Sequence, residues 1–228
     1  MFFYDWTMLL VLPALLLGLW AQARVKSAFD KYSAVRAAFG GTAEAAARRI
    51  LDDSGNGGVA IRRASGLLTD HYNPKDNTLN LSDGVFGSPS LAAIGVAAHA
   101  AGHAMQQHAG YAPLAFRTAI VPAVQIGSRL SVPIFIAGLI FSFGPLQTVG
   151  IALFALTVLF SLITLPVELD ASRRAVAMLT QSGVIQAGDE TDAVKQVLNA
   201  AAMTYVAAAV GAVMQLVRLL ILRSRSRE

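Results

Sequence analysis

Two histidines, His99 and His103, stand four residues apart in the segment LAAIGVAAHAAGHAMQQHAG, which covers residues 91–110. The segment has the composition of a helix, and side chains four residues apart project from the same face of a helix. Two imidazoles at this spacing can bind one metal ion. The chain contains no cysteine, so any further protein ligand must be a histidine, an aspartate or a glutamate.

Glu168 is the strongest candidate for a third ligand. It directly follows a long apolar stretch that can cross a membrane twice, and two crossings return the chain to the side on which it started. His103 and Glu168 then lie on one side, as a shared metal site requires. His108 is a weaker candidate, because five residues of helix rotate it by about 140° from His103. His71 lies in a predicted hairpin and is expected to have no role, with stabilisation of a transition state as the alternative.

The composition indicates an integral membrane protein. Of 228 residues, 55% are hydrophobic and 14% are charged, against about 25% charged residues in a typical soluble domain. Residues 132–167 carry no charge, and Gly144 with Pro145 should divide this stretch into two spans. The net charge of +4 is small and most basic residues flank apolar segments, a pattern that argues against nucleic-acid binding.

The segment between the first span and the metal helix is predicted to mix a helix with short strands. The expected elements are a helix capped by Thr42 and ended by Gly55, a strand over 59–63, and a hairpin with strands at 67–71 and 78–82 around the turn 73–77. Gly40 and Gly41 should end the helix before this segment. Ser88 as a cap and Pro89 at the first helical position predict where the metal helix begins.

The sequence as a whole resembles a known family. The motif HAAGH, with LTDHYNP before it and TLPVELDASRRA after it, is similar to the YugP-like family of neutral zinc metallopeptidases, which are integral-membrane zincins. The similarity extends from AQARVKSAFDKYS to VLNAAAMTYVAAA, which is nearly the whole chain. The order of these motifs also resembles HtpX-type and CAAX-processing membrane metalloproteases, whose third ligand is a glutamate after a membrane hairpin.

This resemblance implies that His99, His103 and Glu168 bind Zn²⁺. The related proteases have an aspartate four residues after the third ligand, where this chain has Ser172. That difference puts in doubt whether Ser172 supports the metal ligands as the aspartate would.

The family pattern has a glutamate at the position of Ala100. In His-Glu-x-x-His sites this glutamate takes a proton from the attacking water, and general acid–base steps contribute about 10²–10⁴-fold to the rate. An alanine methyl cannot accept a proton, whereas both histidines are unchanged. We therefore expect a chain that binds zinc but is strongly impaired as a catalyst. We interpret Ala100 as an engineered inactivation of a native glutamate, with a natural pseudoenzyme as the alternative.

The positive-inside rule predicts the topology. Arg24 and Lys26 follow the first apolar segment and should lie in the cytoplasm. The expected division is a first transmembrane helix (1–23), a cytoplasmic metalloprotease domain (24–118) with the metal helix at about 89–109, a transmembrane hairpin (119–167), a cytoplasmic helix with the third ligand (168–198), a fourth transmembrane helix (199–222) and a basic tail (223–228). The basic tail would also favour the cytoplasm. Four full crossings would instead put it on the same side as the N-terminus, outside the cell, so the sequence leaves the side of the tail undecided.

The sequence therefore predicts a mainly α-helical protein of the cell membrane, with about four transmembrane helices and a zincin-like domain that contains a short β-hairpin. The expected activity is hydrolysis of peptide bonds in peptide or protein substrates, membrane proteins among them, at the cytoplasmic face of the bilayer. An edge strand of the hairpin could hold an extended substrate. The alternative is a non-catalytic zinc-binding pseudoprotease that binds a membrane partner. A metal transporter is disfavoured because the candidate ligands lie at the ends of spans.

Overall fold

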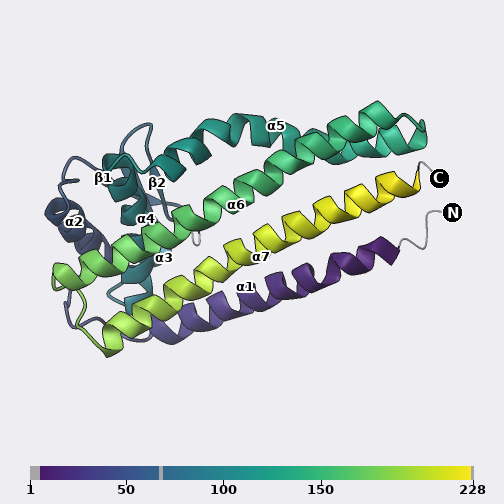
Figure 1. Cartoon of the computed structure of the whole chain (residues 1–228). Coiled ribbons are helices and arrows are strands. Elements are labelled where there is room, and N and C mark those ends of the chain that lie inside the picture. Colours follow the sequence, from purple (N-terminus) through teal and green to yellow (C-terminus); the bar gives the residue numbers. More distant parts are fainter. Residues whose placement is uncertain (1–5, 67–68, 227–228) are drawn as a thin grey trace. The chain divides into compact units, whose positions relative to one another are not determined.

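The computed structural model describes residues 6–66 and 69–226 (Figure 1). Its helices are η1 (Trp6–Leu10), α1 (Leu12–Ser33), α2 (Ala43–Asp53), α3 (Asp83–Phe86), α4 (Leu91–His108), α5 (Ala112–Ile140), α6 (Gly144–Gln181) and α7 (Asp189–Arg225), and its strands are β1 (Ala60–Ala64), β2 (His71–Asn73) and β3 (Thr78–Ser82). The predicted mainly α-helical fold with a small sheet is confirmed.

The chain forms two compact units, and each is described by itself. The helical unit consists of Met1–Ala21, Ala115–Pro166 and Thr204–Glu228, and the α/β unit consists of Gln22–Leu114 and Val167–Met203. The helices α1, α5, α6 and α7 contribute residues to both units.

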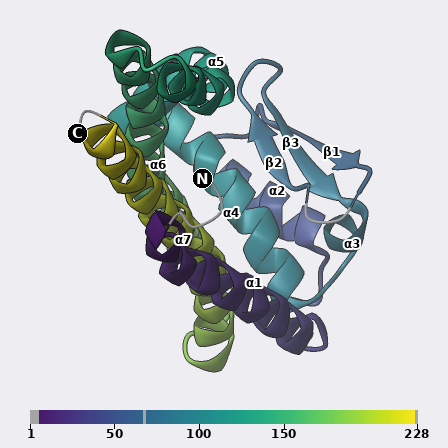
Figure 2. The ribbon, with the colours of Figure 1, turned by 90° about the vertical axis from the view of Figure 1, so that its right-hand side faces the viewer.

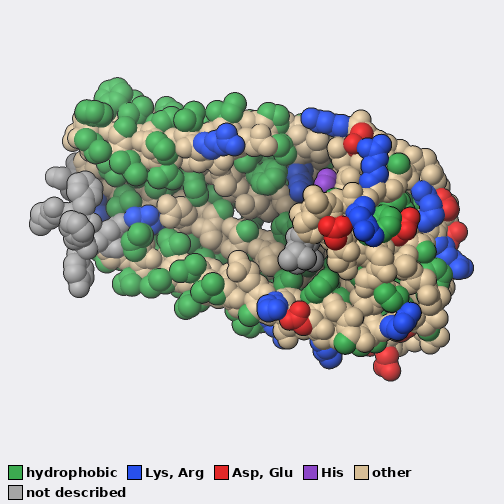
Figure 3. All heavy atoms as spheres, turned by 180° about the vertical axis from the view of Figure 1, so that it is seen from behind, with side chains coloured by type: hydrophobic (Ala, Val, Ile, Leu, Met, Phe, Trp, Pro, Cys, Tyr) green, Lys and Arg blue, Asp and Glu red, His purple; other side chains and the backbone are tan. Residues whose placement is uncertain are grey.

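Within the described residues, four helical segments are long and apolar enough to cross a membrane. They are Trp6–Ser33, Ala112–Ile140, Gly144–Gln181 and Asp189–Arg225. Hydrophobic side chains cover the surface of the long helices, whereas charged side chains gather on the α/β unit (Figure 3). The predicted four-span membrane protein is confirmed in this respect.

Small residues bring α5 and α6 together in the helical unit. A Cβ added at Gly150 would lie 2.7 Å from the backbone nitrogen of Phe135, so the two helices can approach this closely only with glycine there. Phe135 is fully buried and packs with Ile151 and Leu219 of the neighbouring helices. The predicted break near Gly144 is confirmed, because α5 ends at Ile140 and α6 begins at Gly144.

Two of the predicted helix ends are wrong. The span and the polar helix expected on either side of residue 167 form one helix, α6, so the third-ligand candidate Glu168 lies inside a helix rather than at its start. The helix α7 runs into the basic tail as far as Arg225, beyond the end at residue 222 that was expected for the fourth span. The change from apolar to polar side chains alters the surroundings of a helix but does not interrupt its backbone hydrogen bonds.

The sheet of the α/β unit has β3 in the centre (Figure 2). It pairs antiparallel with β2, which confirms the predicted hairpin, and parallel with β1, which the sequence did not predict. The first hairpin strand is His71–Asn73 and not 67–71, so Asn73 belongs to the strand instead of the turn. Leu67 and Leu68 of the predicted strand lie outside the described residues.

The helix α4 begins two residues later than predicted. Its cap is Ser90, whose Oγ accepts a hydrogen bond from the backbone nitrogen of Ala93 at 3.2 Å. The preceding residues are held in extended conformation, because the carbonyl of Pro89 accepts from Ala37 N at 3.1 Å. The same pairing explains why α1 ends at Ser33, well before the predicted break at Gly40. Thr42 caps α2 as predicted, with Oγ1 3.2 Å from Ala45 N.

The helix α4 is a core element of the α/β unit and approaches the neighbouring helix α6 closely. Most of its buried residues are alanine or glycine, so the partner backbones can come near. A Cβ added at Gly102 would overlap the carbonyl oxygen of Ala171 in α6 and lie 3.1 Å from its carbonyl carbon. This contact lies between His99 and His103 on one helix and three residues after Glu168 on the other, so it sets the distance between the candidate ligands.

Replacement of Gly102 by alanine should destabilise the protein. Alanine gains up to about 1 kcal/mol in helix propensity, but overpacking against a rigid backbone costs about 1–3 kcal/mol and should win. We expect a lower midpoint of thermal unfolding for Gly102→Ala in detergent, with weaker zinc binding. The matched control is Gly84→Ala, because nothing lies within 4 Å of a Cβ at Gly84. Equal midpoints for both variants would contradict the close-packing argument.

Candidate metal centre

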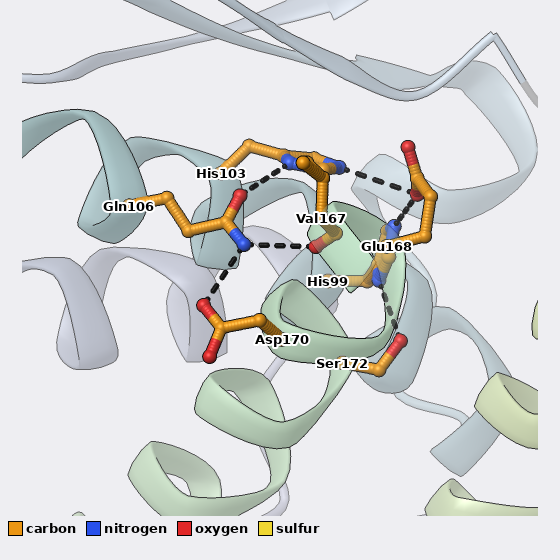
Figure 4. A network of polar contacts seen from close by, with 7 residues as sticks. All are labelled: His99, His103, Gln106, Val167, Glu168, Asp170 and Ser172. Atoms are coloured by element: carbon orange, nitrogen blue, oxygen red, sulfur yellow. Dashed lines mark hydrogen bonds and ion pairs between the residues drawn. The ribbon is translucent and has the colours of Figure 1, made fainter. Parts of the chain in front are cut away.

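The two histidines of α4 and Glu168 of α6 converge within the α/β unit (Figure 4). The Glu168 Oε2 atom lies 3.1 Å from Nε2 of His99 and 3.5 Å from Nε2 of His103. The two imidazole rings stand edge to face, with centroids 4.9 Å apart and an angle of 85° between their planes. The structure thus brings together residues that are far apart in the sequence, because 65 positions separate His103 from Glu168.

The donor atoms suit a zinc ion. One ligand atom from each of the three residues lies within 4.8 Å of the others. Ligands about 2.0–2.1 Å from a tetrahedral zinc lie about 3.3–3.4 Å from one another, close to the two distances above. Two imidazoles and one carboxylate also match the protein ligands of catalytic zinc sites, which leave a fourth position for water or substrate. The residues present therefore fit Zn²⁺, the cofactor that the sequence predicts.

Glu168 is held as a carboxylate although its side chain is only 3% exposed. Burial by itself would raise the pKa of this carboxyl group. The contacts with the imidazoles of His103 and His99 outweigh burial, and they hold the pKa of Glu168 well below its usual value. A carboxylate that stays ionised is able to bind a cation across the neutral pH range.

Ser172 contacts the first histidine from the side opposite the carboxylate. Its Oγ lies 3.0 Å from Nδ1 of His99, so Nε2 of the same ring points to Glu168. A hydroxyl can orient an imidazole in this way, although it carries no charge as an aspartate does. This contact supports a role for Ser172 in orienting a metal ligand, which the sequence had left in doubt. That role stays a prediction.

The second histidine has a partner that the sequence analysis missed. Gln106 is fully buried, and its Oε1 lies 3.0 Å from Nδ1 of His103. Its amide group also contacts Asp170, where burial raises the pKa but contacts with Arg174, Gln106 and Arg173 lower it below the usual value. One sequence feature could have identified Gln106, because it is a polar side chain three residues after a candidate ligand in a helix rich in alanine.

The other candidate positions lie apart from the three converging residues. Of the histidines in the described chain, His71 and His108 are outside the group that could hold a metal. The Nδ1–H of His71 donates to the carbonyl of Thr69 at 2.7 Å, and its Nε2 faces Asn80 at 3.4 Å. His108 is exposed at the end of α4. Ala100 is 2% exposed and belongs to the hydrophobic core beside the metal-binding face.

Comparisons with known proteins agree with this geometry. The model of the family described as "Putative neutral zinc metallopeptidase" matches residues 7–224. A protein of Bacillus subtilis (strain 168) named "Putative membrane protease YugP" is 42% identical over 219 residues, which cover 96% of this chain and 97% of that protein. No solved structure matches this chain.

Removal of either histidine should abolish tight zinc binding. The purified chain in detergent is expected to hold one zinc ion, and His99→Ala or His103→Ala should each leave the site with too few ligands. Zinc content after dialysis, measured by atomic spectrometry, checks this. His108→Ala is the matched control on the same helix and should keep the zinc. Unchanged zinc in the double variant of His99 and His103 would overturn the metal site.

Proposed function

We propose that this chain, which belongs to the family of putative neutral zinc metallopeptidases, is built as a zinc endopeptidase that acts on peptide bonds at the cytoplasmic face of a membrane. The observation that carries the proposal is the convergence of His99, His103 and Glu168 on one side of α4. The name of the Bacillus subtilis relative, a membrane protease, supports the same reaction class.

The chemistry of the site follows from these residues. Zinc, when bound, lowers the pKa of water toward about 7 and polarises a peptide carbonyl. The imidazoles of His99 and His103 and the carboxylate of Glu168 orient the site and leave one position open. Hydrolysis also requires a group that takes a proton from the attacking water and returns it to the departing nitrogen.

The residue for that proton transfer is missing in this chain. Ala100 stands directly after His99, where the His-Glu-x-x-His pattern has glutamate. Its methyl group cannot accept a proton, so we propose that the chain binds zinc but hydrolyses peptides poorly. We propose that an inactivating change, made by engineering, replaced a native glutamate with alanine in a protein whose candidate zinc ligands stay together.

The substrate in this proposal is a peptide or protein segment in extended conformation. The strand β2 is at the edge of the sheet, with β3 on its other side. An edge strand has backbone groups without a partner in the sheet and can pair with an extended peptide. The sheet edge supports substrate binding by backbone hydrogen bonds, and membrane proteins are the expected substrates because the chain itself is embedded in a bilayer.

A second candidate function follows from Ala100 itself. If the alanine is native, the same site belongs to a pseudoprotease, which binds zinc and binds a membrane partner without cleaving it. The burial of Ala100 in the core supports this second candidate, because a glutamate needs more space than a methyl group. The two functions share the metal site and differ in whether a restored glutamate produces catalysis.

Restoring glutamate should restore activity. Ala100→Glu is expected to raise the rate of zinc-dependent hydrolysis of an unfolded protein such as casein by about 10²–10⁴-fold. Ala100→Gln is the matched control, because it has nearly the same volume but cannot act as a base at neutral pH. A folded, zinc-loaded Ala100→Glu variant that cleaves no better than Ala100→Gln would favour the pseudoprotease. Thermal unfolding of both variants checks that the core accommodates the longer side chain.

The proposed cytoplasmic side of the site can be tested with single cysteines, because the chain has none of its own. Lys75→Cys is exposed in the β2–β3 turn, and Phe141→Cys, at a residue that is 75% exposed, lies in the turn between α5 and α6. A membrane-impermeant maleimide should label Phe141→Cys in intact spheroplasts and Lys75→Cys only after permeabilisation. The reverse pattern would place the candidate metal centre outside the cell.

A further inference from the structure

Gln106 has a set of contacts that determines how its amide is oriented. Its Nε2 lies 2.8 Å from the carbonyl oxygen of Val167 and 2.9 Å from Oδ2 of Asp170, and its Oε1 lies 3.0 Å from Nδ1 of His103 (Figure 4). A backbone carbonyl can only accept hydrogen bonds. The NH₂ group of Gln106 must therefore face Val167, and the amide oxygen must face His103.

The orientation of this amide decides which nitrogen of His103 carries a proton. Because an amide oxygen can only accept, Nδ1 of His103 must be the donor in this contact. In a neutral imidazole with the proton on Nδ1, the other nitrogen, Nε2, has a free lone pair. Nε2 is also the atom that faces Glu168, at 3.5 Å from Oε2. Gln106 thus selects the form of His103 that can bind a metal through Nε2.

Asp170 holds this amide in place from its far side. Its Oδ2 accepts from Nε of Arg174 at 2.6 Å as well as from Gln106, and its Oδ1 accepts from Nη2 of Arg173 at 2.7 Å. The guanidinium of Arg174 in turn lies over the ring of Tyr111, 5.6 Å from its centroid. Reversal of the Gln106 amide would place its oxygen against a carboxylate and a carbonyl, so the observed orientation is strongly favoured.

The same side chain connects two of the three ligands. The carbonyl of Val167 is part of the peptide group whose nitrogen belongs to Glu168, so Gln106 joins the ring of His103 to the backbone that carries the carboxylate. All polar atoms of the Gln106 amide have partners inside a fully buried environment. A residue that only filled this space could be apolar, whereas the Gln106 amide pairs with groups on both α4 and α6.

We propose that Gln106 is a positioning residue of the zinc site, which fixes the tautomer and orientation of His103 and couples them to Glu168. The proposal rests on the proposed function, in that these residues bind zinc. In this proposal Gln106 and Asp170 support the metal ligands and do not bind the metal themselves. Loss of such supporting partners typically weakens metal binding by about 10–100-fold.

The test compares two equal substitutions in adjacent positions of α4. Gln106→Met removes the amide but keeps the length of the side chain, and Gln107→Met makes the same change at an exposed residue. Zinc affinity of the full chain in detergent is measured by competition with a chromophoric chelator. We expect about 10–100-fold weaker binding for Gln106→Met and unchanged binding for Gln107→Met. Equal affinity of Gln106→Met and the unmodified chain would overturn the proposal.

A spectroscopic measurement separates this role from a general effect on packing. In the unmodified chain, loaded with zinc and labelled with nitrogen isotope in its histidines, His103 should bind through Nε2 and keep a slowly exchanging proton on Nδ1. That proton should exchange rapidly in Gln106→Met. If Gln106→Met does not fold, the measurement on the unmodified chain alone tests the proposal. Rapid exchange of the proton on Nδ1 of His103, or a bond to zinc through Nδ1, would exclude the proposed role. Failure of the unmodified chain to bind zinc would instead overturn the proposed function, and this inference with it.

Discussion

The metal site depends on the close approach of two helices, α4 and α6, at Gly102 and Ala171. No side chain larger than hydrogen fits at Gly102, so the backbones meet directly. The candidate ligands lie immediately around this contact, with His99 and His103 on one helix and Glu168 on the other. Small residues along α4 therefore have a functional consequence, because they place an imidazole and a carboxylate within hydrogen-bonding distance of each other.

The close approach buries polar groups, and the surrounding side chains satisfy them. A buried carboxylate or amide without partners costs several kcal/mol in order of magnitude. Here each imidazole uses Nε2 toward Glu168 and has a second partner at Nδ1, Ser172 for His99 and Gln106 for His103. The result is a site whose ligand atoms point to one place. Partners that fix the orientation of ligand side chains lower the free-energy cost of metal binding.

Metal binding and proton transfer depend on different side chains in this chain. The three converging residues form a donor set that fits zinc, and Ala100 is not one of them. Ala100 lies on an adjacent face of the same helix, where it packs in the core. The chain therefore belongs to a family of zinc metallopeptidases, whereas the methyl group of Ala100 cannot transfer a proton.

The sequence alone determined the features that depend on local patterns. Helical spacing identified His99 and His103, uncharged length identified the spans, and an even number of crossings pointed to Glu168. The tertiary structure alone decided the contacts between distant segments, such as the parallel pairing of β1 with β3 and the hydrogen bonds of Gln106 and Ser172. Periodicity and hydropathy report on neighbours along one helix or strand. Which residues meet across two helices depends on how closely their backbones approach, and one glycine at the crossing decided that distance.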